Sequence, residues 1–379
     1  MVMLTEEQRL LRDTVRDLAD EQIAPRAAEI DRTAEFPWDV KELFAAQDVF
    51  AVHFPERFGG LGGDLLTACL AIEQVSRVCA TSGLILAVQG LGALPLLMAG
   101  TEEQQQRWLP DLAAGRTLVA FAITEAEAGS DAAAIRTRAV RDGDEYVISG
   151  GKRFISQGSV ADLVMVIAAT GGDEDRHRRL SCLAVETDRP GFRVERVEHK
   201  MGIRGSPTAE LVFDDVRVPA DHLVGAEGDG FKITMRTFDR SRPGIAAQAV
   251  GIAQGALEVA ARYARERRQF GRPIAEFQMV AAMLADMDAA TEAARQLLYA
   301  ACVEIEGGAR DSARWASLAK LVAGDTAMKV TTDAVQVLGG YGYVDEYPVE
   351  RMMRDAKITQ IYEGTQQIQR LVVARALLG

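Results

Sequence analysis

The sequence predicts an α+β protein of three parts: an N-terminal α-helical domain (1–118), a middle antiparallel β-domain (119–225) and a C-terminal four-helix bundle (226–379). Three observations predict this division. Apolar residues recur at helical spacing in the first part. Short β-type runs separated by turn signals fill the second. Long, Ala-rich amphipathic stretches fill the third. A chain of 379 residues is too long for a single compact core and suits two or three subdomains.

Local signals define the N-terminal helices. Thr5-Glu6-Glu7-Gln8 and Thr101-Glu102-Glu103-Gln104 both have the pattern of a capping box. Pro25 is expected to end or kink the first helix, or to mark the start of the next. The Gly- and Pro-containing run 55–63 predicts a turn between two helical stretches.

The middle segment contains the strand signals. Asp142-Gly143 predicts a turn, and the runs 163–167 and 180–185 are short and apolar. The run 171–179 is polar and predicts a loop between those two strands. Two further short runs at 211–218 lead into Pro219. Together these features predict a small antiparallel β-domain.

The helical period returns after Gly230. Stretches near 230–266, 274–306 and 312–338 are long and amphipathic, and a last helix is expected near 365–377. These helices suit a bundle.

Composition excludes several classes of protein. The net charge of −12 disfavours binding to nucleic acid or to anionic lipid. The four cysteines form no CxxC motif and lie near no His pair, so we expect neither a metal site nor disulfides, and a reducing cytoplasm fits best. The N-terminus has the pattern of neither a signal peptide nor a transit peptide. We find no stretch of 18 apolar residues without charge and therefore expect no transmembrane helix.

Several runs combine residue types that suit a phosphorylated ligand. Small and hydroxyl residues let backbone N–H groups approach a phosphate, an aromatic ring offers a flat face, and Arg binds phosphate bidentately. Taken singly, each run has a simpler interpretation as a turn, a strand, a helix cap or a charged surface. A GxGxxG unit joining a strand to a helix is absent, which excludes a Rossmann domain. In chain order, the runs are 121–131, 152–158, 199–208, 238–243, 267–273, 336–342 and 353–370.

These runs, in this order, resemble the acyl-CoA dehydrogenase family. The run that ends in Tyr362-Glu363-Gly364-Thr365 resembles the segment that carries the family's catalytic base. Thr124-Glu125-Ala126-Glu127-Ala128-Gly129-Ser130-Asp131 resembles the flavin loop TEPGAGSD, and Lys152–Gly158 resembles the strand KxWITNG. The run 199–208 is close to one found in short- and branched-chain members.

The resemblance implies a role for particular residues. Glu363 would be the catalytic base. The residues implied to bind FAD, some of them across a subunit interface, are Phe121, Ile123, Thr124, Ser130, Phe154, Ser156, Arg267, Gln269, Phe270, Gln278, Gln336, Gly339, Gly340, Thr365 and Gln367. The residues implied to contact the substrate are Ser130, Asp239, Arg242, Tyr362, Gly364 and Arg375.

The sequence departs from the family pattern at identifiable positions. Ala126-Glu127 replaces Pro-Gly in the flavin loop, and this extra carboxylate is expected to loosen or re-aim the loop. Phe154 replaces Trp and Ser156 replaces Thr, which keeps an aromatic face and an O–H donor. Ser241 occupies the position where a branch that includes isovaleryl-CoA dehydrogenases carries its base as Glu, so the base is expected at Glu363. Arg242 is expected to lower the pKa of that base and to hold its rotamer.

The implied activity is FAD-dependent oxidation of an acyl-CoA thioester to the trans-2-enoyl-CoA, with electrons passed to an electron-transferring flavoprotein. Family members are commonly homotetramers built as dimers of dimers. Two alternatives stay open. One is a flavoenzyme of the same fold that desaturates, reduces or oxidises a carrier-bound or unusual acyl thioester. The other is a non-catalytic flavoprotein that binds acyl-CoA.

Overall fold

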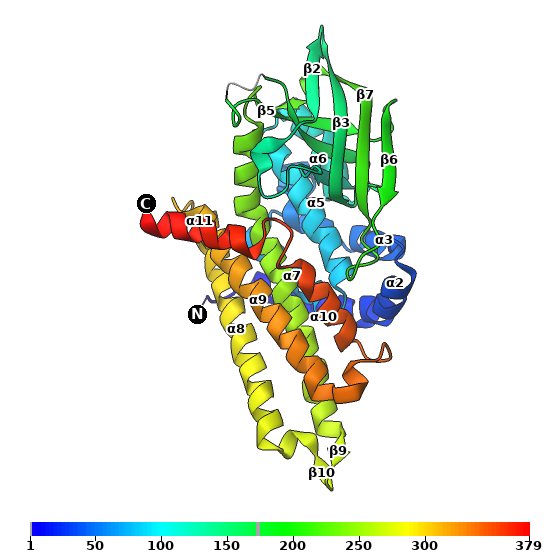
Figure 1. The fold of residues 1–379 in the computed structure, drawn as a ribbon, viewed down its shortest axis with the longest axis vertical. Helices are drawn as coiled ribbons and strands as arrows, with labels where there is room; N and C mark the ends of the chain where they lie inside the picture. The colour runs from blue at the N-terminus through cyan, green and yellow to red at the C-terminus, as the bar shows by residue number, and fades with distance from the viewer. Residues whose placement is uncertain (1, 172–174) are drawn as a thin grey trace.

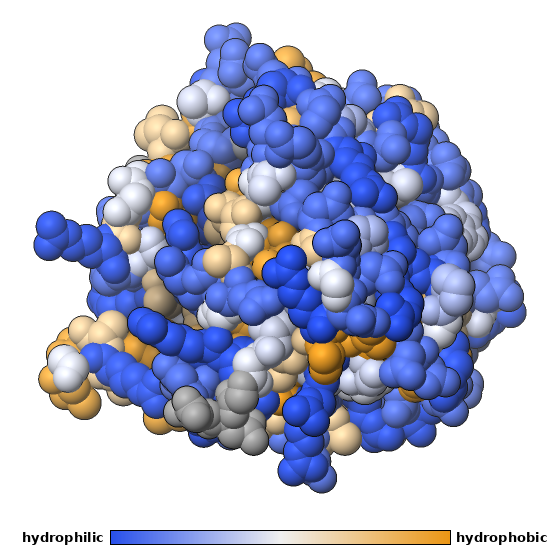
Figure 2. All heavy atoms as spheres, turned by 90° about the horizontal axis from the view of Figure 1, so that it is seen from above, coloured by the Kyte–Doolittle hydropathy of each residue, from blue (hydrophilic) through white to orange (hydrophobic). Residues whose placement is uncertain are grey.

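The computed structural model describes residues 2–171 and 175–379. Helices precede and follow a β-sheet along the chain. Figure 1 shows the sheet at one end of an elongated molecule and the long C-terminal helices at the other. The end that carries the sheet is largely hydrophilic when viewed from above, with apolar side chains gathered near the middle of the view (Figure 2).

The N-terminal part is helical, as the sequence predicts. Both expected capping boxes form: the Thr5 hydroxyl accepts from the Gln8 amide and the Thr101 hydroxyl from the Gln104 amide, and each Gln side chain accepts from the amide of its Thr. Pro25 lies in a short 3₁₀ turn that follows a π-helical turn at Ala19–Ile23, so it marks the start of a new segment. The α-helices are α1 (Glu6–Leu18), α2 (Ala27–Thr33), α3 (Trp38–Ala46), α4 (Leu65–Ser76), α5 (Ala80–Ala99) and α6 (Glu102–Ala113).

The middle part is a sheet with the strand order β6-β7-β3-β2-β4-β5-β8, and β1 lies beside β4. Its pairs are antiparallel except that β1 and β2 each meet β4 in parallel. The β1–β4 pair is parallel because the β2–β3 hairpin intervenes and provides the crossover. The strands are β1 (Val119–Ala122), β2 (Arg138–Asp142), β3 (Glu145–Ser156), β4 (Leu163–Ala169), β5 (Leu180–Glu186), β6 (Phe192–Val197), β7 (Thr208–Pro219) and β8 (Leu223–Val224).

Two strand predictions are refined by the structure. The turn at Asp142-Gly143 joins β2 to β3, with Gly143 at φ 64°. The two runs at 211–218 belong to one strand, β7, and Asp215 adopts a left-handed φ of 53° between them. Of the predicted loop 171–179, residues 172–174 lie outside the described residues.

The C-terminal part contains the long helices. Helix α7 (Gly230–Glu266) and helix α9 (Ser312–Leu338) occupy the predicted ranges, and α8 (Gln278–Glu306) begins four residues later than expected. A small hairpin of β9 (Arg268–Gln269) and β10 (Arg272–Pro273) joins α7 to α8, and α11 spans Gln366–Leu378. Helix α10 (Val349–Ile358) was not expected, because half of its residues are charged and it is short.

Two helices in the described chain, α5 and α7, are long and apolar enough to cross a membrane by length and composition alone. The sequence analysis did not single out the run between Arg77 and Glu102, which contains no charged residue, and its expectation of no transmembrane helix stays a prediction. Within the protein, 67% of the apolar window of α5 and 78% of that of α7 is buried. This burial is what core helices show, and it accounts for their composition without a membrane.

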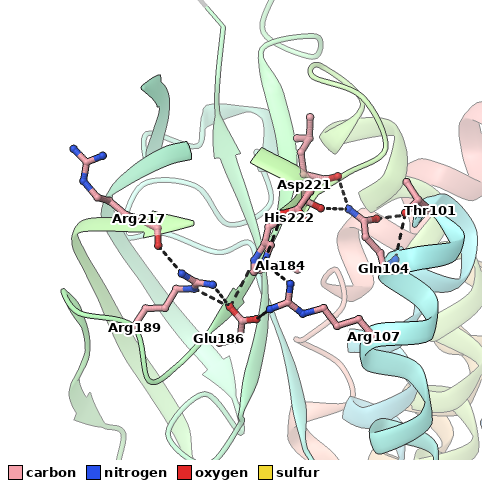
Figure 3. Close-up of polar contacts among 10 residues, drawn as sticks. Thr101, Gln104, Arg107, Ala184, Glu186, Arg189, Arg217, Asp221 and His222 are labelled. Atoms are coloured by element: carbon pink, nitrogen blue, oxygen red, sulfur yellow. Dashed lines mark hydrogen bonds and ion pairs between the residues drawn. The ribbon is translucent and has the colours of Figure 1, made fainter. Parts of the chain in front are cut away.

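The sheet is held on helix α6 by a set of polar contacts (Figure 3). The Gln104 amide donates to the carbonyls of Asp221 and Leu223 at 2.6 and 2.8 Å. Arg107 donates to Glu186 at 2.8 Å and to Nε2 of His222 at 3.1 Å. Because Arg is always a donor, Nε2 of His222 accepts, and its Nδ1–H donates to the Ala184 carbonyl at 2.9 Å. Burial lowers the pKa of His222, which keeps this neutral tautomer.

We expect Gln104→Ala to destabilise this junction by roughly 1–3 kcal/mol, since it removes two partly buried hydrogen bonds to backbone carbonyls and the capping-box bond from the Thr101 amide. Equilibrium denaturation monitored by circular dichroism measures the loss. Gln106→Ala, an exposed amide on the same helix, is the matched control. Equal stability of the two variants would show that the Gln104 contacts do not hold the sheet on α6.

Candidate active site

Glu363 lies in a strained turn between α10 and α11. Its φ is 52° and that of Gly364 is 92°, both in the left-handed region. The φ of Gly364 is one that residues with a Cβ rarely adopt, so the position favours glycine. A non-glycine residue in this conformation costs about 1–3 kcal/mol and persists only where its surroundings hold it.

The carboxylate of Glu363 points towards helix α7. The Ser241 hydroxyl donates a short hydrogen bond to its Oε2. Burial raises the pKa of Glu363, while the Ser241 hydrogen bond and the charges of Arg242 and Lys320 oppose that rise. A carboxylate whose pKa is raised by enclosure is a better proton acceptor than one in water.

Arg242 holds the backbone of the turn. It is buried, and its Nε donates to the carbonyl oxygen of Glu363 at 3.2 Å. Its Nη1 lies 3.4 Å from the Ser317 hydroxyl and 3.9 Å from Asp239 Oδ1. The sequence-based role of Arg242 is confirmed in part. Its charge lowers the pKa of Glu363, although burial outweighs that effect, but Ser241 and not Arg242 bonds the carboxylate.

Three other predicted residues surround this turn. Thr365 caps the N-terminus of α11 by accepting from the Ile368 amide at 3.4 Å. The Tyr362 hydroxyl, partly buried, donates to Oε1 of Gln248. Asp239 lies on α7 one turn before Arg242, and burial raises its pKa. By contrast, Gln367 and Arg375 are exposed on α11.

Sequence reasoning missed several residues around Glu363. Ser317 and Lys320 of α9 and Gln369 of α11 are buried beside the turn. The signal was present in α9, where Lys320 occupies the same face as Ala316, Ala319 and Ala323. A lysine on the apolar face of a helix is rarely buried without a specific role.

The predicted flavin loop is tied to strand β3. Lys152 is fully buried, and its Nζ donates to the Ile123 carbonyl at 3.0 Å and to Glu125 at 2.8 Å. Glu125 in turn accepts from the amides of Arg136 and Thr137 at 2.6 and 3.0 Å. The adjacent Glu127 forms an exposed ion pair with Arg136 at 2.7 Å. This extra carboxylate therefore faces solvent and leaves the anchoring of the loop intact.

Strand β3 presents an aromatic ring beside that loop. The Arg153 amide donates to the Thr124 carbonyl at 2.8 Å, which places Phe154 next to Thr124. Phe154 has a left-handed φ of 57° in an irregular part of β3 and is 59% exposed. The simpler interpretation of this run as an ordinary strand is therefore wrong at Phe154, whose ring is exposed. Ser156 is half-buried two residues further on.

The flavin segment and the Glu363 turn are linked through α7. The Phe121 ring lies 6.1 Å from that of Phe238, and the Arg242 guanidinium lies 5.5 Å from the Phe238 ring. Ser130 is exposed at the end of the loop. An outward-facing ring at Phe154 and accessible hydroxyls at Thr124 and Ser156 provide the flat face and the donors that a flavin needs, so these residues fit FAD.

The remaining predicted cofactor residues lie at the other end of α7. Arg267, Gln269 and Phe270 belong to the β9–β10 hairpin, and Phe270 is 93% exposed. The Arg267 guanidinium lies 5.3 Å from the Tyr341 ring, which brings the hairpin to the end of α9. Figure 1 shows this hairpin far from the sheet. Within one chain, this group does not reach the flavin segment, and its other members, Gln278, Gln336, Gly339 and Gly340, are also exposed.

A large cavity borders Ser241, the residue that hydrogen-bonds the Glu363 carboxylate. It measures about 910 Å³ and is bounded mainly by α4, α5, α7 and the loop before α4. Asp239 and Ser241 line one part of it, and Ala87, Gly90 and Leu91 of α5 line another. Its size suits an organic ligand. Among the described residues, no group of three or more His, Cys, Asp or Glu side chains is placed to hold a metal ion.

Comparison with known proteins identifies the family. The family models for the N-terminal, middle and C-terminal domains of acyl-CoA dehydrogenase match residues 5–116, 120–216 and 228–378. A probable acyl-CoA dehydrogenase of Mycobacterium leprae is 48% identical over 99% of this chain and 96% of its own.

Solved structures agree with that match. The butyryl-CoA dehydrogenase of Megasphaera elsdenii superposes with a TM-score of 0.96 at 42% identity, covering 100% of both chains. A chain from a structure described as the electron transferring flavoprotein of Acidaminococcus fermentans has a TM-score of 0.97 at 45% identity, covering 100% of this chain and 99% of that one. The chain therefore belongs to the acyl-CoA dehydrogenase family, whose members are FAD-binding oxidoreductases that act on CH–CH bonds.

Proposed function

We propose that the protein oxidises the Cα–Cβ bond of an acyl-CoA thioester to the trans-2-enoyl-CoA, with Glu363 as the base that removes the α-proton. The observation that carries this proposal is the position of the Glu363 carboxylate. It is enclosed, has a raised pKa and hydrogen-bonds a residue that lines the 910 Å³ cavity. An α-proton is weakly acidic, so its removal needs a base of raised pKa in a dry site.

The chain also supplies a donor for the thioester carbonyl. No described residue accepts a hydrogen bond from the Glu363 amide, so this N–H is available to a ligand. A donor there would stabilise the negative charge that develops on the carbonyl oxygen as the α-proton leaves. Bound FAD supplies the hydride acceptor. Phe154, Thr124 and Ser156 would hold the flavin against the sheet.

The proposal extends to the assembly and to the electron acceptor. The exposed group at Arg267 and Phe270 lies too far from the flavin segment to serve the same FAD within one chain, which favours a site completed by a second protomer. We propose a homotetramer built as a dimer of dimers, located in the cytoplasm. An electron-transferring flavoprotein is the proposed acceptor, and fatty acid β-oxidation is the proposed pathway. The short-chain relative supports a short acyl group as the first substrate to test.

The proposed half-reaction is tested by visible spectroscopy. We expect anaerobic butyryl-CoA to bleach the oxidised flavin bands of the wild-type protein, and Glu363→Gln to slow this about 10²–10⁴-fold because the general base is lost. Glu346→Gln, an exposed carboxylate on the preceding loop, is the control. Rapid bleaching by Glu363→Gln would remove Glu363 from the mechanism. Bleaching by no acyl-CoA would favour a carrier-bound substrate, and rapid reoxidation in air would favour an oxidase.

Ser241→Ala is expected to shift the pH dependence of the reaction. The Ser241 hydroxyl stabilises the ionised form of Glu363, so its loss raises the pKa of Glu363 further. The base works when deprotonated, and the acid limb of kcat/KM against pH should therefore move to higher pH. Steady-state rates across pH measure the shift, with Ser312→Ala as a control hydroxyl that also lines the cavity. An unchanged acid limb would contradict the role of the hydrogen bond.

Arg267→Ala is expected to weaken FAD retention, because a bidentate donor to a pyrophosphate would be lost. The ratio of flavin to protein after gel filtration measures the effect, and the elution volume reports the assembly. Arg265→Ala, which removes a nearby exposed guanidinium on the last turn of α7, is the control. Equal flavin content in the two variants would count against a cofactor contact at Arg267.

A further inference from the structure

Lys320 of helix α9 is a fully buried cation without an acidic partner. Its side chain is 0% exposed, and it forms no ion pair with a carboxylate in the described part of the chain. Its Nζ donates instead to the Gly364 carbonyl at 2.8 Å and to Oε1 of Gln366 at 3.2 Å. A buried ammonium group is costly unless it is hydrogen-bonded or paired. The two hydrogen bonds of Lys320 offset this cost, and one of them binds the Gly364 carbonyl.

The Gly364 carbonyl belongs to the strained turn that carries Glu363. Three helices donate to the two carbonyls of this turn: Lys320 comes from α9, Arg242 from α7 and Gln369 from α11. Arg242 bonds the Glu363 carbonyl at 3.2 Å, and Gln369 bonds the carbonyls of Glu363 and Gly364 at 3.1 and 2.9 Å. Donors from three helices therefore hold the left-handed backbone in place. Backbone strain of this kind persists only where the surroundings hold it.

The lysine also places a positive charge near the base. Glu363 and Lys320 each affect the other's titration, and the other charged groups that face Lys320 are Arg242 and Asp325. Asp325 is engaged elsewhere, accepting from Gln360, Gln366 and Arg370. Burial lowers the pKa of Lys320 to about 7, so its charge is fully present only below that pH.

We propose that Lys320 is a positioning residue for the base. Its ammonium group fixes the Gly364 carbonyl so that the Glu363 carboxylate meets Ser241 at the cavity, and its positive charge favours the ionised, proton-accepting form of Glu363. This inference rests on the proposed role of Glu363 as the base. No residue of α9 was assigned to the Glu363 site from the sequence.

Three substitutions separate the effect of the Lys320 hydrogen bonds from the effect of its positive charge. Lys320→Gln keeps a hydrogen-bond donor and removes the charge, Lys320→Arg keeps both, and Lys320→Met removes both. Lys329→Gln removes the same charge from an exposed position on the same helix and is the matched control. All variants are prepared with FAD, and circular dichroism establishes that each is folded.

The first readout is the pH dependence of anaerobic flavin bleaching by butyryl-CoA, followed below pH 7. Removing a positive neighbour raises the pKa of a carboxyl group, so the acid limb should move up by roughly one unit in Lys320→Gln and Lys320→Met. On that limb the rate at a fixed pH falls about tenfold. Lys320→Arg should restore much of the wild-type profile, and Lys320→Met should also lower kcat on the plateau with KM little changed. Lys329→Gln should match the wild type.

The second readout does not depend on turnover. Infrared difference titration of the Glu363 carboxyl group, identified by its loss in Glu363→Gln, should show the same upward shift in Lys320→Gln. An unshifted Glu363 titration in folded Lys320→Gln would overturn the proposal, whatever happens to stability. If no acyl-CoA bleaches the wild-type flavin, the proposed function fails separately, and the infrared titration still decides the role of Lys320. If Lys320→Met does not fold, the Glu363 titration in Lys320→Gln and Lys320→Arg still tests the proposed role of Lys320.

Discussion

The position of helix α7 depends on a close crossing with α4 that only glycine permits. A Cβ at Gly255 would lie 1.9 Å from the Arg77 carbonyl oxygen, and one at Gly251 would lie 2.3 Å from that of Glu73. Backbone therefore meets backbone, and the Arg77–Glu258 ion pair at 2.8 Å joins the two helices at the same level. Because α7 also carries Asp239, Ser241 and Arg242, this crossing fixes the position of these three residues relative to α4. The same helix leads to the β9–β10 hairpin at its other end (Figure 1).

The chemistry of the Glu363 site arises from a balance between enclosure and polarity. Enclosure raises the pKa of the carboxyl group, and the Ser241 hydroxyl and the two nearby cations restrain that rise. A site with enclosure alone would keep the carboxyl group protonated, and a site with cations alone would leave a weak base. The same donors hold the strained backbone, so geometry and basicity are controlled by shared contacts.

Much of the fold could be predicted because its signals are local. The capping boxes at Thr5 and Thr101 depend on residues three apart, and α7 and α9 have long uninterrupted amphipathic patterns. Helix α10 was not predicted because it is short and half of its residues are charged, so its buried face gives no clear apolar pattern in the sequence. The parallel pairing of β1 with β4 depends on residues 119 and 163 meeting in space, which no local pattern encodes.

The residues of the Glu363 site also divide into those that the sequence indicated and those that it did not. Motif resemblance placed Glu363, Ser241 and Arg242 in one region, and the structure brings them together. It did not indicate which group touches the carboxylate, because that depends on the direction of a left-handed turn. Lys320 was overlooked because its partners are backbone and amide oxygens of the segment from 364 to 366, distant in sequence. The boundaries of the three domains and the individual cofactor contacts stay predictions.

The hydrogen bond between Ser241 and Glu363 joins two elements that lie 122 positions apart in the chain. A carboxylate grown from either element would end in nearly the same place, at the edge of the same cavity. The position of the proposed proton acceptor is therefore set by the approach of these two elements and not by either segment alone.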